Sequence, residues 1–155
     1  MNRLYTLLIA AFFFQFNISA QTNHLVNAGN YYYTPTNLTV NVGDTVTWFN
    51  DGGFHDVNGD TNTITGSNFN NPEVFYLNPV SGPAEIGSFV FTIPGTYNYD
   101  CSVGQHAANG MVGSITVNIP GCTDITACNY DSLATINDSS CIFAATITEN
   151  ISNVS

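Results

Sequence analysis

The sequence predicts an all-β protein: an antiparallel β-sandwich of about seven or eight short strands with a small disulfide-stapled tail. Three observations lead to this fold class. Between residues 22 and 119, apolar and polar side chains alternate with a period of two, which is typical of half-buried strands. Turns rich in Gly, Pro, Asn and Asp separate the alternating segments. No window in this range has the period of an amphipathic helix.

Residues 1–20 predict a secretory signal peptide. Arg3 supplies the basic start, an uncharged apolar run from Leu4 to Phe16 follows, and Ala20 ends the segment with a small residue. The run is shorter than the roughly 20 residues that a membrane-spanning helix needs, and a retained anchor is the alternative. We therefore expect an exported chain that begins near Gln21, is periplasmic, cell-surface or extracellular, and has no stable membrane insertion after cleavage.

The first strands of the sandwich are predicted at residues 38–42 and 45–48. Leucine and valine alternate with threonine and asparagine in the first segment, and valine and tryptophan alternate with threonine in the second. Gly43-Asp44 forms the turn between them, and Gly52-Gly53 ends the second pattern. His55 follows this break, so we expect it at the end of a rigid strand pair.

The later strands are predicted at residues 89–93, 97–101 and 111–119, each with alternating apolar side chains. Residues 58–87 are rich in Asn, Gly, Pro and Ser, and they predict a long connection that holds one strand or helical turn. Cys101 shares a strand face with two tyrosines, at the start of the loop before the last strand.

A change in composition at Pro120-Gly121 divides the chain into a sandwich domain at residues 21–119 and a tail at residues 120–155. The tail contains three of the four cysteines, at Cys122, Cys128 and Cys141. Cysteines of an exported protein are expected to be oxidised. For three cysteines, the simplest pairing is one disulfide with one free thiol left over. The sequence does not decide which two cysteines pair. The third cysteine could also pair with a cysteine beyond residue 155 if the chain is part of a longer protein.

Charge excludes several classes of partner. Arg3 is the only Lys or Arg, so its removal changes the formal net charge from −10 to −11. A chain without basic side chains cannot neutralise phosphates, which excludes nucleic acid, and an anionic membrane surface repels it. We expect a protein partner with a basic docking face.

Cys101, His106 and Met111 follow one another at intervals of five residues within one loop. A thiolate, an imidazole and a thioether are soft or borderline donors that suit copper, and a thioether is a poor ligand for zinc, calcium or magnesium. His55 offers a second imidazole from another loop. Two His, one Cys and a weak axial Met form the donor set of a blue-copper electron-transfer site. The sequence therefore predicts one type 1 copper ion bound by His55, Cys101, His106 and Met111.

Three segments resemble the cupredoxins, the plastocyanin and azurin group. They run from Thr34 to Trp48, from Phe54 to Val57, and from Gly95 to Met111-Val112-Gly113, and the resemblance covers residues 24–119. It implies a Greek-key sandwich with the same four copper ligands. It also implies that the ring edge of the second histidine lies in an exposed apolar patch where electrons enter or leave. Here that patch would include Ala107, Ala108 and Gly110.

Two positions depart from the family pattern. Four residues separate Cys101 from His106, where plastocyanin-like members have two, and this spacing resembles the auracyanin- and azurin-like members. Asp56 follows the first histidine, where the family often has Asn. This change is expected to weaken the hydrogen bond between that side chain and the ligand loop.

The tail from Gly121 to Cys141 resembles a short repeat of large secreted Bacteroidetes proteins, with serine in place of its usual glycine at 139 or 140. The resemblance implies a disulfide-stapled spacer that more modules follow in longer chains. Calcium binding by the tail's aspartates is the alternative, although their spacing does not match an EF-hand: Asp124, Asp131 and Asp138.

We expect an electron carrier, as a monomeric domain, and not an enzyme. Multicopper oxidases and copper nitrite reductases share the fold but need many more histidines than the three in this chain, of which His24 is expected at the surface. Copper delivery favours Met-rich or His-rich clusters, and the chain has two Met. A non-redox surface or adhesion module on the same fold is the remaining alternative.

Overall fold

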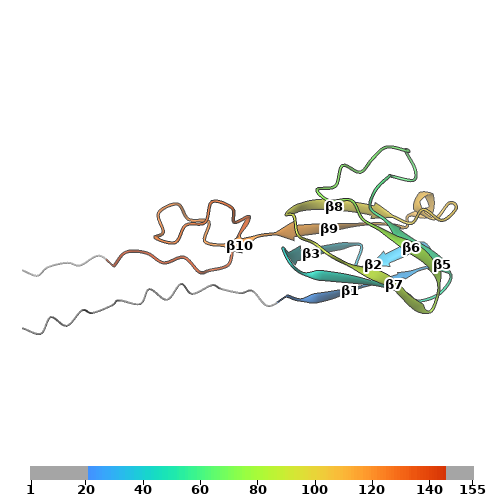
Figure 1. Cartoon of the computed structure of the whole chain (residues 1–155), viewed down its shortest axis with the longest axis horizontal. Coiled ribbons are helices and arrows are strands. Elements are labelled where there is room, and N and C mark those ends of the chain that lie inside the picture. Colours follow the sequence, from blue (N-terminus) through green and yellow to red (C-terminus); the bar gives the residue numbers. More distant parts are fainter. Residues whose placement is uncertain (1–20, 146–155) are drawn as a thin grey trace, which may run out of the picture.

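The computed structural model describes residues 21–145, so the predicted signal peptide lies outside the described residues. Two β-sheets face each other and enclose one hydrophobic core (Figure 1). In spatial order, the first sheet contains β2 (Tyr32–Thr34), β1 (Asn23–Gly29), β4 (Thr45–Asn50) and β7 (Ala84–Val90). The second contains β3 (Asn37–Asn41), β9 (Val112–Asn118), β8 (Gly95–Asp100), β5 (Phe54–Asn58) and β6 (Tyr76–Ser81). The predicted all-β sandwich is confirmed.

The sheets are mixed, so the expectation of purely antiparallel pairing is wrong in two places. β1 runs parallel to β4, and β3 runs parallel to β9. The reason lies between β2 and β3, where only Pro35 and Thr36 intervene and the chain passes from one sheet to the other without reversing. The next turn reverses the chain once, and β4 therefore runs beside β1 in the same direction.

The alternating segments supply the core, as predicted. Val46 and Trp48 of β4 and Ile115 and Val117 of β9 are all buried between the sheets. The Trp48 ring contacts the edge of Tyr99 on the opposite sheet, with ring centroids 5.5 Å apart. Such aromatic pairs add to the free energy gained from burying the rings, so they tie the two sheets together.

Residues 58–87 contain more strand than the sequence predicts. β6 and the first part of β7 both fall in this range, where we expected one strand or helical turn. β6 is an edge strand that pairs only with β5, includes Pro79 and has no fully buried residue. An edge strand buries little of its surface, and so it lacks the strict alternation by which a strand is found in a sequence.

Asp44 connects the first residues of the domain to the turn between β3 and β4. Its carboxylate accepts the backbone N–H groups of Thr22 and Asn41, both at 2.9 Å, and lies 3.0 Å from His24 Nε2. His24, which we expected at the surface, is therefore half-buried and paired with Asp44. Burial favours a higher pKa for Asp44, but the two backbone bonds and His24 outweigh it and lower the pKa.

Asp44→Asn is expected to destabilise the protein at neutral pH and to matter less in acid. Because the folded-state pKa is lowered, the stabilisation is complete above the ordinary value of 3.8 and is lost as the pH falls through the folded-state value. Denaturant unfolding at pH 7 should show a loss of about 1–3 kcal/mol, and at about pH 2 a smaller loss. An equal loss at both pH values would contradict this role.

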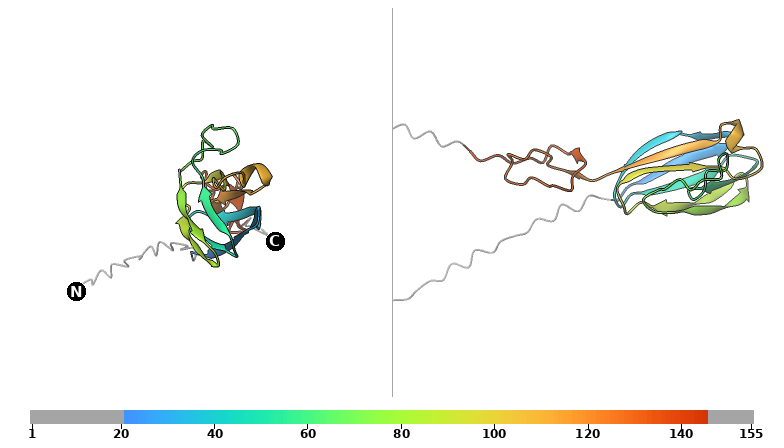
Figure 2. Two further views of the ribbon diagram at one scale, coloured as in Figure 1. Left: turned by 90° about the vertical axis from the view of Figure 1, so that its right-hand side faces the viewer. Right: turned by 90° about the horizontal axis from the view of Figure 1, so that it is seen from above.

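The tail forms a small module that extends beyond one end of the sandwich (Figures 1 and 2). β10 (Pro120–Gly121) and β11 (Ile136–Asn137) pair in parallel, and a disulfide joins Cys122 to Cys141. Cys128 is free and exposed. The sequence did not decide this pairing; in the structure Cys122 pairs with Cys141, and Cys128 is the free thiol. Within residues 21–145, no helix has the length and apolar character to cross a bilayer.

Candidate metal centre

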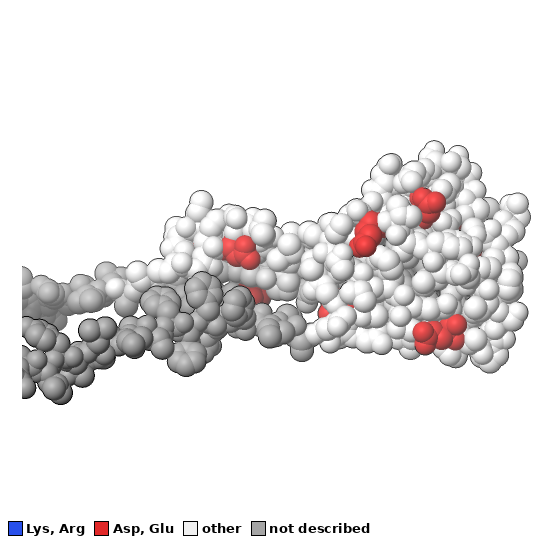
Figure 3. All heavy atoms as spheres, in the orientation of Figure 1, with Lys and Arg blue, Asp and Glu red and all other residues white. Residues whose placement is uncertain are grey.

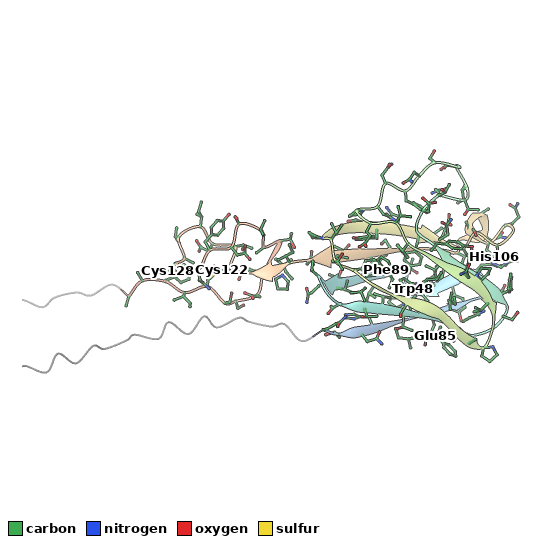
Figure 4. All side chains as sticks on the ribbon, in the orientation of Figure 1. Trp48, Glu85, Phe89, His106, Cys122 and Cys128 are labelled. Atoms are coloured by element: carbon green, nitrogen blue, oxygen red, sulfur yellow. A yellow bond between two sulfur atoms is a disulfide. The ribbon has the colours of Figure 1, made fainter. Side chains whose placement is uncertain are left out.

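Three of the predicted ligand residues meet at one end of the sandwich. His55 lies in β5, Cys101 directly follows β8, and His106 lies in the loop that leads to β9. Cys101 Sγ is 3.4 Å from His106 Nδ1 and 3.9 Å from His55 Nδ1. The two imidazole nitrogens are 3.1 Å apart. Figure 4 shows His106 at the end of the sandwich opposite the module that carries Cys122 and Cys128.

The loop backbone brings Met111, the fourth predicted residue, to the same place. The Cys101 N–H donates to the Met111 carbonyl at 3.1 Å, and the Met111 N–H donates to the His106 carbonyl at 3.0 Å. The short 3₁₀ helix η1 (Ala107–Asn109) between them ends at Gly110, whose φ of 100° lies in the left-handed region that favours glycine. The Met111 side chain is fully buried. The loop therefore closes on itself with Cys101, His106 and Met111 together.

The three nitrogen and sulfur donors fit a single metal ion. Donors about 2.0–2.3 Å from an ion lie roughly 3.5–4 Å apart in trigonal geometry. The separations of 3.1, 3.4 and 3.9 Å between the donor atoms are close to this. Two imidazoles and a thiol beside a buried thioether suit copper better than a hard cation such as calcium or magnesium.

No second metal cluster supports the calcium alternative. Within residues 21–145, His55, Cys101 and His106 are the only group of His, Cys, Asp or Glu side chains close enough together to hold a metal ion. In the tail, Asp124 and Asp131 instead accept hydrogen bonds from the backbone N–H groups two residues further along, both at 2.9 Å. These aspartates cap local turns.

The family follows from a comparison with known proteins. A family model described as copper binding proteins of the plastocyanin/azurin family matches residues 20–118. The chain belongs to this family. It is a cupredoxin with a copper-binding site, as the resemblance of its sequence segments implied.

Two plastocyanins agree with this assignment. The cupredoxin is 36% identical over 93 residues to the chloroplastic plastocyanin of Oryza sativa subsp. indica, a match that covers 59% of this chain and 58% of the relative. It is 34% identical over 92 residues to the plastocyanin of Scenedesmus fuscus, covering 59% of this chain and 91% of that one. Among solved structures, a purple cupredoxin from Nitrosopumilus maritimus is 29% identical with a TM-score of 0.48, covering 61% of this chain and 98% of that chain.

His106 is the most exposed of the four residues. His55, Cys101 and Met111 are buried, whereas His106 is half-buried. Around it, the implied apolar patch needs a correction, because η1 turns Ala107 inward and leaves it only 2% exposed. Ala108 and Gly110 are exposed as expected.

Tyr31 is a neighbour of His106 that sequence reasoning missed. Its ring meets the His106 ring edge-on, with centroids 5.2 Å apart, and it is 42% exposed. Of the three tyrosines at residues 31–33, only Tyr33 enters the core. Tyr32 points to the other face of β2, and Tyr31 lies in the turn before β2, with a φ of 66°. The surface of the cupredoxin at His106 is therefore partly aromatic.

Burial sets the protonation of the metal-free donors. It raises the pKa of Cys101 to about 11, against the opposing effect of backbone N–H groups from Asp56 and Val103. Burial and the neighbouring His106 both lower the pKa of His55. The metal-free pocket at neutral pH is thus a thiol beside a neutral imidazole, and metal binding there releases the thiol proton.

Asp56 holds the two ligand-bearing segments together. Its Oδ1 accepts the backbone N–H of Ser102 at 2.7 Å, and its Oδ2 accepts the Ser102 hydroxyl and, at 3.1 Å, the Tyr76 hydroxyl. The Tyr33 hydroxyl donates to the Asp56 carbonyl at 2.6 Å. The expectation that aspartate weakens the bond to the ligand loop is therefore wrong, because both carboxylate oxygens reach Ser102.

Asp100 fixes the long connection against β8, the strand that directly precedes Cys101. Its fully buried carboxylate accepts the Thr63 N–H at 2.7 Å, the Thr63 hydroxyl at 2.8 Å and the Asn58 side-chain amide at 3.0 Å. The signal in the sequence is the position of Asp100 directly before Cys101. A carboxylate that is buried there needs hydrogen-bond donors of this kind. The partners themselves come from residues 42 and 37 positions away in the sequence.

Proposed function

We propose that this cupredoxin carries single electrons through one type 1 copper ion bound by His55, Cys101, His106 and Met111. One observation carries the proposal: a histidine of β5 and a cysteine and a histidine of the loop between β8 and β9 have donor atoms within 4.8 Å of one another. The cysteine is buried and forms no disulfide, so its sulfur is available to a metal.

The protein's part in this function is to hold the donors still. Copper, when bound, supplies the one-electron chemistry by alternating between Cu(I) and Cu(II). β5 supports His55, and the hydrogen-bonded loop between β8 and β9 supports the other three residues. Donors that are fixed before the metal arrives need little movement when the charge of the site changes, which favours fast electron transfer. Half-buried His106 is the side chain through which we expect electrons to pass.

We also propose that the partner is a redox protein with a basic docking face and that the chain is exported. Acidic side chains lie scattered over the face in Figure 3, and residues 21–145 contain no Lys or Arg. Opposite charge would speed the encounter and make it sensitive to salt. The division into a signal peptide at residues 1–20, a copper domain at 21–119 and a spacer at 120–155 belongs to the same proposal.

Catalysis and copper delivery are less well supported. The chain has three histidines, and His24 is paired with Asp44, which leaves two for metal binding. Additional catalytic copper ions would therefore lack ligands. The enclosed cysteine also favours a resident ion over one that is passed on, because delivery requires easy exchange.

The test is to load purified protein with Cu(II). We expect an intense blue colour at one copper per chain from thiolate-to-copper charge transfer, reversible bleaching by ascorbate, and recovery on reoxidation. Copper binding without colour would favour delivery, and no copper binding would favour an adhesion module. Either outcome would overturn the electron-carrier proposal.

A further inference from the structure

Asp56 places an uncompensated carboxylate beside the metal centre. The residue is completely buried, with 0% exposure. Residues 21–145 contain no Lys or Arg, and their one ion pair, His24 with Asp44, does not involve Asp56. Buried carboxylates are normally paired with a cation or a metal ion. The nearest positive charge available to Asp56 is therefore the metal ion itself.

The hydrogen bonds to Asp56 hold the carboxylate in place and do not cancel its negative charge. The donors are the Ser102 N–H at 2.7 Å, the Ser102 hydroxyl, and the Tyr76 hydroxyl at 3.1 Å. All three are neutral groups, so they solvate the charge and leave its sign unchanged. Ser102 directly follows Cys101, and Asp56 directly follows His55. The carboxylate is thus held between two of the proposed ligands by bonds that fix its position.

The charge lies close to two proposed ligands. The Asp56 carboxylate bonds to Ser102, which directly follows Cys101, and Asp56 itself directly follows His55. A fixed negative charge at this place disfavours added electron density at a metal bound by these residues. Interactions of this kind are strong where water is excluded and are little screened by salt.

We propose that Asp56 tunes the copper site toward Cu(II), which lowers its reduction potential and makes the reduced protein a stronger electron donor. This inference rests on the proposed function. The oxidised site carries one more positive charge than the reduced site, and a fixed negative neighbour stabilises the oxidised site more. A partner that oxidises this cupredoxin can therefore itself have a modest potential.

Asp56→Asn is the decisive variant because it removes the charge and keeps the shape. The amide oxygen can accept the Ser102 N–H, and the amide nitrogen can donate to the hydroxyls of Ser102 and Tyr76. Redox titration of the blue band should show the ratio of Cu(II) to Cu(I) affinity falling at least tenfold. For one electron this is a rise in potential of about 59 mV or more.

Asp51→Asn is the matched control. Asp51 is exposed and accepts a hydrogen bond from the Tyr32 hydroxyl at 2.8 Å. The variant therefore removes the same charge from a carboxylate that is also bonded to a tyrosine, but one that lies in water. We expect its affinity ratio to change less than about threefold and to approach the wild-type value in high salt. The effect of Asp56→Asn should persist in high salt.

Tyr76→Phe provides a test in the opposite direction. It removes one hydrogen bond that spreads the carboxylate charge, and Tyr76 is 48% exposed, so folding should tolerate the change. The ratio of Cu(II) to Cu(I) affinity should rise by about twofold. A role confined to holding the loop would not predict opposite signs for the two variants.

Each outcome decides the question. If wild-type protein is not blue, the proposed function fails, and this inference fails with it. If wild-type protein is blue and the Asp56→Asn potential matches that of Asp51→Asn, only the tuning role is refuted. If Asp56→Asn loses its colour, the Tyr76→Phe potential decides, and a potential equal to wild type or higher would refute the proposal.

Discussion

Cys101→Ser is expected to abolish the blue colour of the copper-loaded protein completely. The colour requires charge transfer from a thiolate to Cu(II), and a serine hydroxyl cannot supply it. Wild-type protein should also gain thermal stability from copper, because a ligand that binds only the folded state stabilises that state. The variant should lose most of this gain, and absorption spectra with thermal melts at matched copper concentrations measure both effects.

Cys128→Ser is the control for that substitution. Cys128 is the other free cysteine, but it is exposed and lies in the module at the opposite end of the sandwich (Figure 4). Its loss should leave the colour and the copper-dependent stability unchanged. If the Cys128 variant lost the colour and the Cys101 variant kept it, the assignment of the metal centre would be wrong.

Trp48→Ala is expected to cause the largest loss of stability from any single side chain in the core. The Trp48 ring is fully buried, stacks on Phe75 with ring centroids 5.8 Å apart, and meets Tyr99 edge-on. Truncation removes these contacts and leaves a cavity between the sheets, which costs about 3–5 kcal/mol. Denaturant unfolding of the metal-free protein measures the change without a contribution from copper.

Phe49→Ala is the matched control for Trp48. Phe49 is the next residue on the same strand, but its side chain points to the other face and is 36% exposed. We expect a loss below about 1 kcal/mol, since little apolar surface leaves the core. Equal losses for the two variants would mean that the core is not organised around the Trp48 ring.

Local sequence pattern determined the fold class and most of the metal centre. Alternation in β4 and β9 identified Val46, Trp48, Ile115 and Val117 as core residues, because a strand's period of two is a local property. The spacing of Cys101, His106 and Met111 was equally readable, since one short loop carries all three. A donor set confined to one loop needs no knowledge of the rest of the fold.

Only the tertiary structure decided what depends on distant contacts. It brought His55 to a position 3.1 Å from a histidine 51 residues further along the chain, and it selected Tyr31 as the tyrosine that packs on His106. It also showed that the Asp56 carboxylate bonds to Ser102, 46 positions away. The physical reason is that side-chain periodicity records which face a residue occupies, whereas its partners depend on how separate strands pair and how their loops pack.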